Sequence, residues 1–144
     1  MLNIIKLAVG IEDIDHLAEV QKRRLADSQA ANGKKAHLWH RTRHGPRRAE
    51  ELLDGGSLYW VIKGRIAARQ RLLGFESEAD EEGRKFCFMM LDPELVPTAP
   101  RRYRAFQGWR YFPVADVPPD QPKRGGEKDF PSEMAAELRE LGLL

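Results

Sequence analysis

Residues 54–75, DGGSLYWVIKGRIAARQRLLGF, predict a β-hairpin, and this stretch determines the fold class. Aromatic and β-branched residues favour a first strand over residues 57–62. Gly64 is typical of a tight turn, and the second strand carries arginines. The two glycines at 55–56 end a preceding helix and lead into the first strand. The hairpin combines the strongest strand pattern, the densest aromatic content and the centre of the basic charge.

Alternation along the two strands predicts which hairpin side chains form the core. With residues 63–65 as the turn, Ile62 is expected opposite Ile66. The core face then consists of Leu58, Trp60, Ile62, Ile66, Ala68 and Leu72, and the opposite face carries Tyr59, Val61, Ala67, Arg69 and Arg71. A register slip of one residue would bury the two arginines. The cost of burying charge therefore favours the first register.

The rest of the chain predicts a single α+β domain built around this hairpin. Strands are expected at 2–9, 36–44 and 85–91, helices at 14–31 and 47–53, an irregular extended segment at 93–106, and a short aromatic strand or packed loop at 106–112. The 85–91 strand is apolar on both faces, which is typical of a central strand. Because the strands after residue 57 follow one another directly, we expect a small mixed, curled sheet or open barrel with flanking helices. This domain covers 1–112, followed by a Pro/Gly-rich flexible segment at 113–131 and a C-terminal helix at 132–144 that packs on the same domain.

Composition favours a cytoplasmic protein. The chain has 144 residues and one cysteine, Cys87, which excludes an intramolecular disulfide framework and a cysteine-based zinc site. Its place in the middle of a strand predicts a buried, inert thiol. No run approaches the roughly 18 apolar residues of a membrane span, and the N-terminal residues lack the pattern of a signal peptide.

Charge is segregated along the chain, although the formal net charge is only +2. Residues 34–71 hold ten basic and three acidic side chains, and residues 72–94 hold seven acidic and two basic ones. A third block, 101–110, contains four arginines and no acid. Such segregation can create a positive face that attracts anions. The alternative is that the blocks neutralise one another in the folded protein.

A basic and aromatic set around the hairpin predicts contacts to nucleic acid. Its members are Trp39, Arg41, Arg43, Arg47, Arg48, Tyr59, Arg69 and Arg71. Arginine forms bidentate pairs with phosphate, and an aromatic face stacks on an unpaired base. On the 36–44 strand, alternation puts His37, Trp39, Arg41 and Arg43 on one face. The alternative is that Trp39 belongs to the core and the arginines pair with neighbouring acids.

A second aromatic and basic set could close over a ligand held by the hairpin. It consists of Arg101, Arg102, Tyr103, Arg104, Phe106, Gln107, Trp109 and Arg110. The alternative is a loop attached to the core by Phe106 and Trp109, with solvated arginines. From both sets, together with Lys63 of the hairpin turn, the residues expected to contact nucleic acid are Arg41, Arg43, Tyr59, Lys63, Arg69, Arg71 and Arg110.

No motif predicts a metal, a cofactor or a defined reaction. The histidines at 37, 40 and 44 are spaced like ligands on a helix, but on a strand His37 points away from His40. His40 beside Thr42 could transfer protons, or it could be a core or surface histidine. The glycines before Ser57 match neither a phosphate loop nor a nucleophile elbow.

Five segments resemble a bacterial family catalogued as a domain of unknown function, number fourteen-eighty-nine. They are residues 2–10, 46–64, 69–73, 106–111 and 138–144, so the resemblance covers nearly the whole chain. The segment GGSLYWVIKG is its most specific part. The family is catalogued without a function, so the resemblance implies no catalytic residue.

A weaker likeness in architecture is to PUA-like and ASCH barrels. It rests on a strand ending in Thr-Arg, a proline with a short helical turn, and two glycines before the next strand. These folds generally hold RNA or a modified base, and one ASCH branch hydrolyses an acylated base with Lys, Thr and Glu. The likeness would give those roles to Thr42, Lys63, and Glu76 or Glu51, although no motif fixes them.

These patterns lead to three hypotheses. The first is a module that binds RNA or a modified nucleotide, which would bring Arg43, Arg69, Arg71 and Arg110 to one concave surface. The second is a small hydrolase acting on a base or nucleotide, which needs Lys63, Thr42 and a carboxylate in one cavity. The third is an interaction protein that uses 103–112 and the proline-rich tail as an exposed apolar patch. Whether the protein is an enzyme stays open, as do its ligand and oligomeric state.

Overall fold

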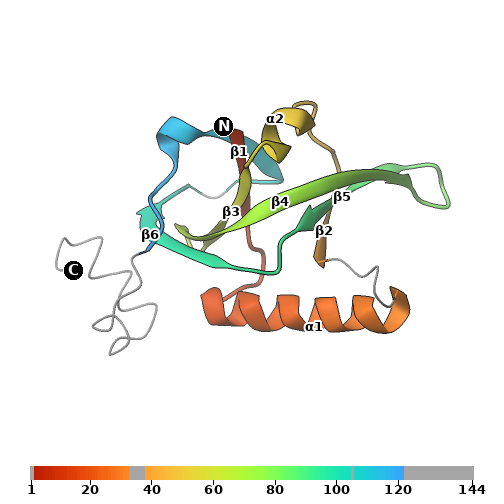
Figure 1. Cartoon of the computed structure of the whole chain (residues 1–144), viewed down its shortest axis with the longest axis horizontal. Coiled ribbons are helices and arrows are strands. Elements are labelled where there is room, and N and C mark those ends of the chain that lie inside the picture. The colour runs from red at the N-terminus through yellow and green to blue at the C-terminus, as the bar shows by residue number, and fades with distance from the viewer. Residues whose placement is uncertain (1, 33–37, 105, 122–144) are drawn as a thin grey trace.

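The predicted hairpin is formed by strands β3 and β4 in the computed structural model of the protein (Figure 1). The structure describes residues 2–32, 38–104 and 106–121. Its elements are, in chain order, β1 (Leu2–Leu7), α1 (Ile14–Asn32), β2 (Leu38–Thr42), α2 (Ala49–Leu53), β3 (Ser57–Ile62), β4 (Arg65–Ala79), β5 (Lys85–Leu91), β6 (Val96–Arg102), β7 (Trp109–Pro113) and the 3₁₀ helix η2 (Val114–Asp116).

The strands form one mixed, seven-stranded sheet that is not closed into a barrel. The strand order is β2-β5-β4-β3-β1-β7, with β6 paired to β4. Among the described strands, only β1 and β3 run parallel, and the other pairs are antiparallel. The 15-residue β4 pairs with β3 and β6 through its first half and with β5 through its second half. Helix α1 lies below the sheet and α2 above it in Figure 1. The predicted α+β class with a small mixed sheet and flanking helices is confirmed.

The hairpin turn is one residue shorter than expected. Lys63 and Gly64 have φ values of 49° and 79°, so both central residues of a two-residue turn are left-handed. Ile62 therefore pairs with Arg65, and the predicted pairing of Ile62 with Ile66 is wrong. Such a turn matches the right-handed twist of the strands, which explains why the chain uses it although Lys63 must adopt a positive φ.

Both faces of β3 are buried, against two separate clusters. The cluster on the α1 side includes Leu58, Trp60 and Ile62, as predicted, together with Leu17 of α1. The opposite cluster consists of Ile5, Tyr59, Val61, Ile66 and Phe112. Tyr103, Phe106 and Val117 pack against this second cluster, so the face expected to be open at Tyr59 and Val61 is covered.

The position of Ile66 follows from a register shift in the hairpin. Val61 pairs with Ile66, but Trp60 pairs with Ala68, so the ladder is irregular between Trp60 and Val61. A bulge adds one residue to one of the two paired strands, so the alternation of side chains between the two faces shifts on that strand. Ile66 therefore joins the second cluster, whereas alternation alone predicts it on the face of Trp60.

Strand β6 occupies the segment expected to be irregular. It pairs with β4 in spite of Pro97 and Pro100, which is compatible with a strand whose other edge carries only an isolated bridge. That bridge joins Thr98 to Asp120. The described part of the predicted flexible segment, 113–121, thus contacts the sheet. The remainder of that segment and the predicted helix at 132–144 lie outside the described residues.

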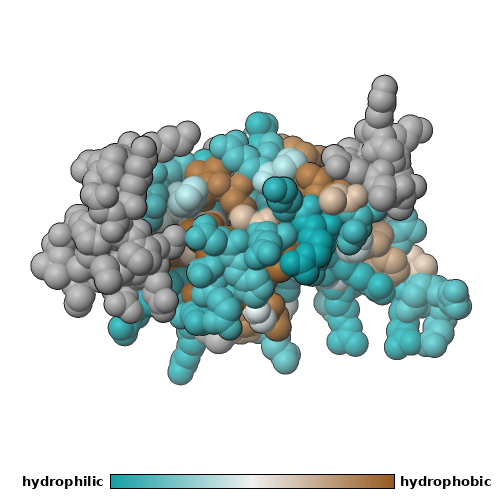
Figure 2. Space-filling model, turned by 90° about the horizontal axis from the view of Figure 1, so that it is seen from below, coloured by the Kyte–Doolittle hydropathy of each residue, from teal (hydrophilic) through white to brown (hydrophobic). Residues whose placement is uncertain are grey.

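Helix α1 buries one side against the sheet and leaves the other in solvent. Leu17, Gln21 and Ser28 are buried, whereas the intervening charged residues are exposed. Figure 2 views the molecule from this side and shows a mostly hydrophilic surface with small hydrophobic areas. Within the described residues, no helix is long and apolar enough to cross a membrane.

Candidate nucleic-acid interface

The outer face of β2 and β5 carries the aromatic and basic side chains that the structure brings together. Trp39 lies opposite Met90, and Arg41 lies opposite Phe88. On the other face of these strands, Leu38, Met89 and Leu91 belong to the α1-side cluster. Trp39 is 39% exposed, and Arg41 is exposed as well. Within the described residues β2 is the last strand at one end of the sheet, so one of its backbone edges has no strand beside it.

Four side chains on this face form a continuous row, which we call the aromatic row: Trp39, Phe88, Phe86 and Arg41. The Trp39 and Phe88 ring centroids are 4.8 Å apart, and the Phe88 and Phe86 centroids 5.1 Å, both in edge-to-face geometry. The Arg41 guanidinium carbon lies 3.9 Å from the Phe86 centroid. Edge-to-face and cation–π contacts each stabilise their geometry by about 0.5–1.5 kcal/mol. The row is therefore held in place before any ligand arrives.

A basic hollow of about 400 Å³ adjoins the row. It is lined by Arg41, Thr42, Arg43, Asp80, Arg84, Lys85 and Phe86. Asp80 pairs with Arg84 at 3.4 Å and also accepts hydrogen bonds from two backbone N–H groups of its turn. Arg43 and Lys85 have no ion-pair partner within the described part of the chain. The hollow therefore keeps an excess of positive charge, which is suited to a phosphate.

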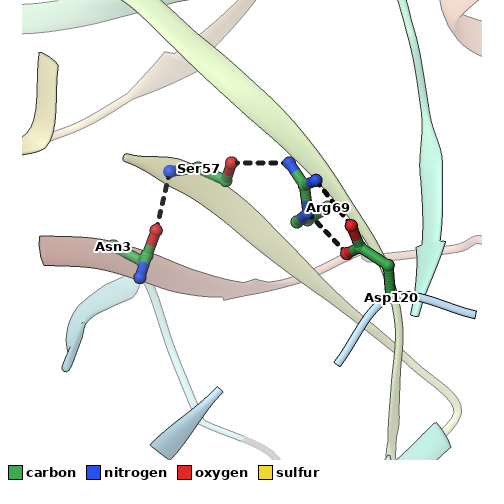
Figure 3. Close-up of polar contacts among 4 residues, drawn as sticks. All are labelled: Asn3, Ser57, Arg69 and Asp120. Carbon is green, nitrogen blue, oxygen red and sulfur yellow. Dashed lines mark hydrogen bonds and ion pairs between the residues drawn. The ribbon is translucent and has the colours of Figure 1, made fainter. Parts of the chain in front are cut away.

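Arg69, by contrast, is occupied by a contact within the protein. Its Nε and Nη2 donate to the two carboxylate oxygens of Asp120 at 2.7 and 2.8 Å, and its Nη1 donates to Ser57 Oγ at 3.2 Å (Figure 3). The pair holds the pKa of the Asp120 carboxyl below its usual value. Asn3 Oδ1 accepts from the Ser57 N–H, so the chain of contacts links β1, β3, β4 and the 120 region. Arg69 thus acts as an anchor for this region.

The remaining predicted contact residues lie away from the aromatic row. Tyr59 is buried in the second cluster, and burial raises the pKa of its hydroxyl. Lys63, in the hairpin turn, pairs with Glu12 at 2.5 Å. Arg71 is exposed on β4 opposite Ser57. Arg110 belongs to β7, the strand at the other end of the sheet from β2. Its guanidinium group lies over the Phe106 ring. Of the seven predicted contact residues, two lie together at the aromatic row and the basic hollow: Arg41 and Arg43.

The aromatic residues of 103–112 pack within the protein. Tyr103 and Phe106 contact the second cluster. The Trp109 indole N–H donates to the His44 carbonyl at 2.8 Å. The Tyr111 hydroxyl accepts from two backbone N–H groups, those of Arg47 and Arg48, at 3.0 and 3.1 Å. These contacts favour the packed loop over a clamp that closes on a ligand.

The residues named for a hydrolase do not converge. Thr42 lines the basic hollow and donates to the His44 carbonyl at 2.9 Å. Lys63 lines a different cavity of about 200 Å³ together with Glu12. Glu51 of α2 pairs with Arg48, which directly precedes this helix. Across the described ranges, no group of three or more His, Cys, Asp or Glu side chains could hold a metal ion.

The family is shown by a match over almost the whole sequence. The family model described as "Protein of unknown function (DUF1489)" matches residues 4–144. The chain belongs to the DUF1489 family. No curated protein and no solved structure matches it. The likeness of this DUF1489 chain to PUA-like barrels accordingly stays a prediction.

Phe86 and Phe88 are the site residues that the sequence does not reveal. An apolar pattern on both faces of 85–91 predicts a strand buried on both sides, and β5 is indeed central in the sheet. Its Cys87, Met89 and Leu91 are buried, but Phe86, Phe88 and Met90 are only half-buried. Burial raises the pKa of the Cys87 thiol, in agreement with an inert side chain. If the pairing of β5 with β2 had been known, it would have placed Phe86 and Phe88 on the same face as Trp39.

His40 lies on the opposite face of β2 from the aromatic row and is expected to make the stability of the protein depend on pH. Burial, with help from the charges of Lys6 and Arg24, lowers the pKa of His40 from 6.5 to about 4. The folded state therefore keeps the imidazole neutral, while the unfolded chain takes up a proton below pH 6.5. Stability is expected to fall by roughly 3 kcal/mol as the pH drops from about 6.5 to 4.

A His40→Phe variant tests this dependence, because it keeps a ring beside Trp60, which the imidazole meets edge-to-face at 5.2 Å. Its free energy of unfolding, measured by urea titration, should change little between pH 6.5 and 4. The exposed His44→Phe variant is the matched control and should keep the wild-type slope. Asp120 has a lowered pKa and loses its contribution only below about pH 4. An unchanged slope in His40→Phe would refute the assignment.

Proposed function

We propose that this DUF1489 protein binds single-stranded RNA or a modified nucleotide through the aromatic row and the basic hollow. The observation that carries the proposal is the row itself. Trp39, Phe88, Phe86 and Arg41 are prearranged on a partly exposed sheet face. They adjoin Arg43 and Lys85, which have no ion-pair partner among the described residues. We place this activity in the cytoplasm, since a chain with one buried cysteine suits a reducing compartment.

The two parts of the surface match the two parts of a nucleotide. An unpaired base can stack on an aromatic side chain, which contributes about 1–3 kcal/mol for each base. Trp39 is the most exposed ring of the row and is suited to this role. Phosphate oxygens can pair with Arg43 and Lys85 in the hollow, where guanidinium and ammonium groups donate charge-assisted hydrogen bonds. Glu76 and Glu78 lie on β4 directly opposite Phe88 and Phe86 of the row and would repel phosphate, which favours a path for the nucleic-acid backbone along β2.

Variants of Trp39, Arg41 and Arg43 test the interface. Affinity for a labelled single-stranded oligoribonucleotide is measured by fluorescence anisotropy at low salt. Trp39→Ala is expected to weaken binding by about tenfold or more, because one stacking contact is lost. The double variant Arg41→Ala/Arg43→Ala should reduce the slope of log affinity against log salt by about 0.7 for each arginine.

Arg110→Ala is the matched control, because it removes the same charge from the opposite edge of the sheet. It should bind within about twofold of the wild type. Absence of binding by the wild type at low salt would overturn the proposal. A single Arg41→Ala variant removes the same number of charges as Arg110→Ala. Equal weakening of binding by these two variants would show that affinity depends on net charge alone. Binding of a mononucleotide as tight as that of the oligomer would assign the site to a free nucleotide.

A further inference from the structure

A separate cavity of about 180 Å³ lies between α1, the end of β1 and β2, on the opposite face of β2 from the aromatic row. Its walls are largely apolar, and they include Leu17 and Trp60. Among the described residues, the only charged side chains in its lining are two cations, Lys6 and Arg24. This described lining therefore carries positive charge without a carboxylate.

The two cations of the cavity are not paired with an acid among the described residues. Lys6 is half-buried, and burial lowers the pKa of its ammonium group. Neither Lys6 nor Arg24 has an ion-pair partner within the described ranges of the chain. Both cations also help to lower the pKa of His40, which lines the same cavity. A desolvated cation without a counterion destabilises the protein, and an anion bound there would remove that cost.

Of the two polar side chains beside the cations, Gln21 has hydrogen-bond partners, whereas His40 has a ring nitrogen without one among the described residues. Gln21 is held by a reciprocal pair of 2.7 Å hydrogen bonds with Gln70, so its amide is already used. His40 Nε2 is buried and has no hydrogen-bond partner within the described part of the chain. A neutral imidazole can either donate or accept a hydrogen bond, depending on its tautomer. An anion with several oxygens could give this nitrogen a partner.

We propose that this cavity binds a small phosphate monoester that carries an apolar group. The dianionic phosphate is held by Lys6 and Arg24, and the apolar group packs against Leu17 and Trp60. Two cations match the charge of a phosphate monoester better than that of a carboxylate. The proposal goes beyond the RNA interface and does not depend on it. Because Trp39 borders both regions, the variants that test this cavity leave Trp39 unchanged.

Calorimetric titration of the full chain with phenyl phosphate tests the proposal. Binding is expected with a Kd of about 1 mM or tighter. Arg24→Gln and Lys6→Gln should each weaken it by about tenfold or more, since each removes a charged contact to the phosphate. Inorganic phosphate and benzyl alcohol, which each lack one half of the ligand, should bind more weakly than phenyl phosphate.

Arg23→Gln is the matched control on the same helix. Arg23 is 70% exposed and pairs with Glu19, so its loss should leave the affinity unchanged. Since Arg24 is exposed on α1, Arg24→Gln is expected to fold and decides the outcome even if Lys6→Gln is unstable. Three results would overturn the proposal: no heat of binding up to about 10 mM phenyl phosphate, equal affinities for Arg24→Gln and wild type, or equal affinities for benzoate and phenyl phosphate.

Discussion

Gly56→Ala is expected to remove a large part of the stability of this protein. A Cβ at this position would lie 2.2 Å from the Leu2 carbonyl oxygen and 2.3 Å from the Leu52 carbonyl oxygen. Both atoms belong to the backbone, so no side-chain rotation can relieve the overlap. Gly56 also donates its N–H to Leu52 and accepts from Leu72, which ties the end of α2 and β4 to the same point.

The expected loss is about 3–5 kcal/mol, a large part of the 5–15 kcal/mol that stabilises an ordinary domain. Urea unfolding followed by circular dichroism measures it. Gly74→Ala is the matched control, because the nearest atom to its new Cβ would be Met90 Cγ at an ordinary 3.9 Å. That variant should change the free energy of unfolding by less than about 1 kcal/mol. Equal stability of the two variants would contradict the close approach of β1 and α2 at Gly56.

Gln70→Leu is expected to destabilise the protein by about 4 kcal/mol. Gln70 is fully buried in the middle of β4. Its Oε1 accepts from Gln21 Nε2 at 2.7 Å and from the Trp60 indole N–H at 2.8 Å, and its Nε2 donates to the Asp92 carbonyl at 3.0 Å. The substitution leaves these partners buried without a hydrogen bond, and each such group costs about 1–3 kcal/mol.

A double-variant cycle isolates the pair of amides. Gln21→Leu/Gln70→Leu should be more stable than the sum of the two single variants predicts, since it removes both unsatisfied amides together. The exposed Gln107→Leu variant controls for the chemistry of the substitution and should be nearly neutral. The free energy of unfolding from urea titration is again the measurement. Additive losses in the cycle would show that Gln21 and Gln70 do not depend on each other.

The local sequence pattern predicts the hairpin and the class of fold because its signals are short-range. The aromatic and β-branched residues of 57–62 and the glycine at 64 lie within one stretch, and β3 and β4 form there. The predicted hairpin register is wrong because Lys63 takes a positive φ, which few non-glycine residues adopt. The second cluster escapes prediction because Phe112 and Val117 reach β3 from more than 50 residues away.

In the candidate site too, the sequence predicts the features that depend on one strand and misses those that depend on distant segments. Alternation correctly places Trp39 and Arg41 on one face of β2, because both lie on a single strand. Arg69 was expected in the interface, but its partner Asp120 lies in a segment that composition predicts to be flexible. Phe88 was assigned to a strand covered on both faces, because its sequence contains no sign that the outer face of β5 is open. Pairings between distant segments decide the outcomes at Arg69 and Phe88.

The tryptophan indole signals in a nuclear magnetic resonance titration give the most direct test of the proposed interface. The sequence contains three tryptophans, each in a different environment. Trp39 lies in the aromatic row, Trp60 donates its indole N–H to Gln70, and Trp109 donates its own to His44. On addition of a single-stranded oligoribonucleotide, the Trp39 indole signal should shift while those of Trp60 and Trp109 stay in place. A shift of Trp109 without Trp39, or binding that moves no indole signal, would contradict an interface on β2 and β5.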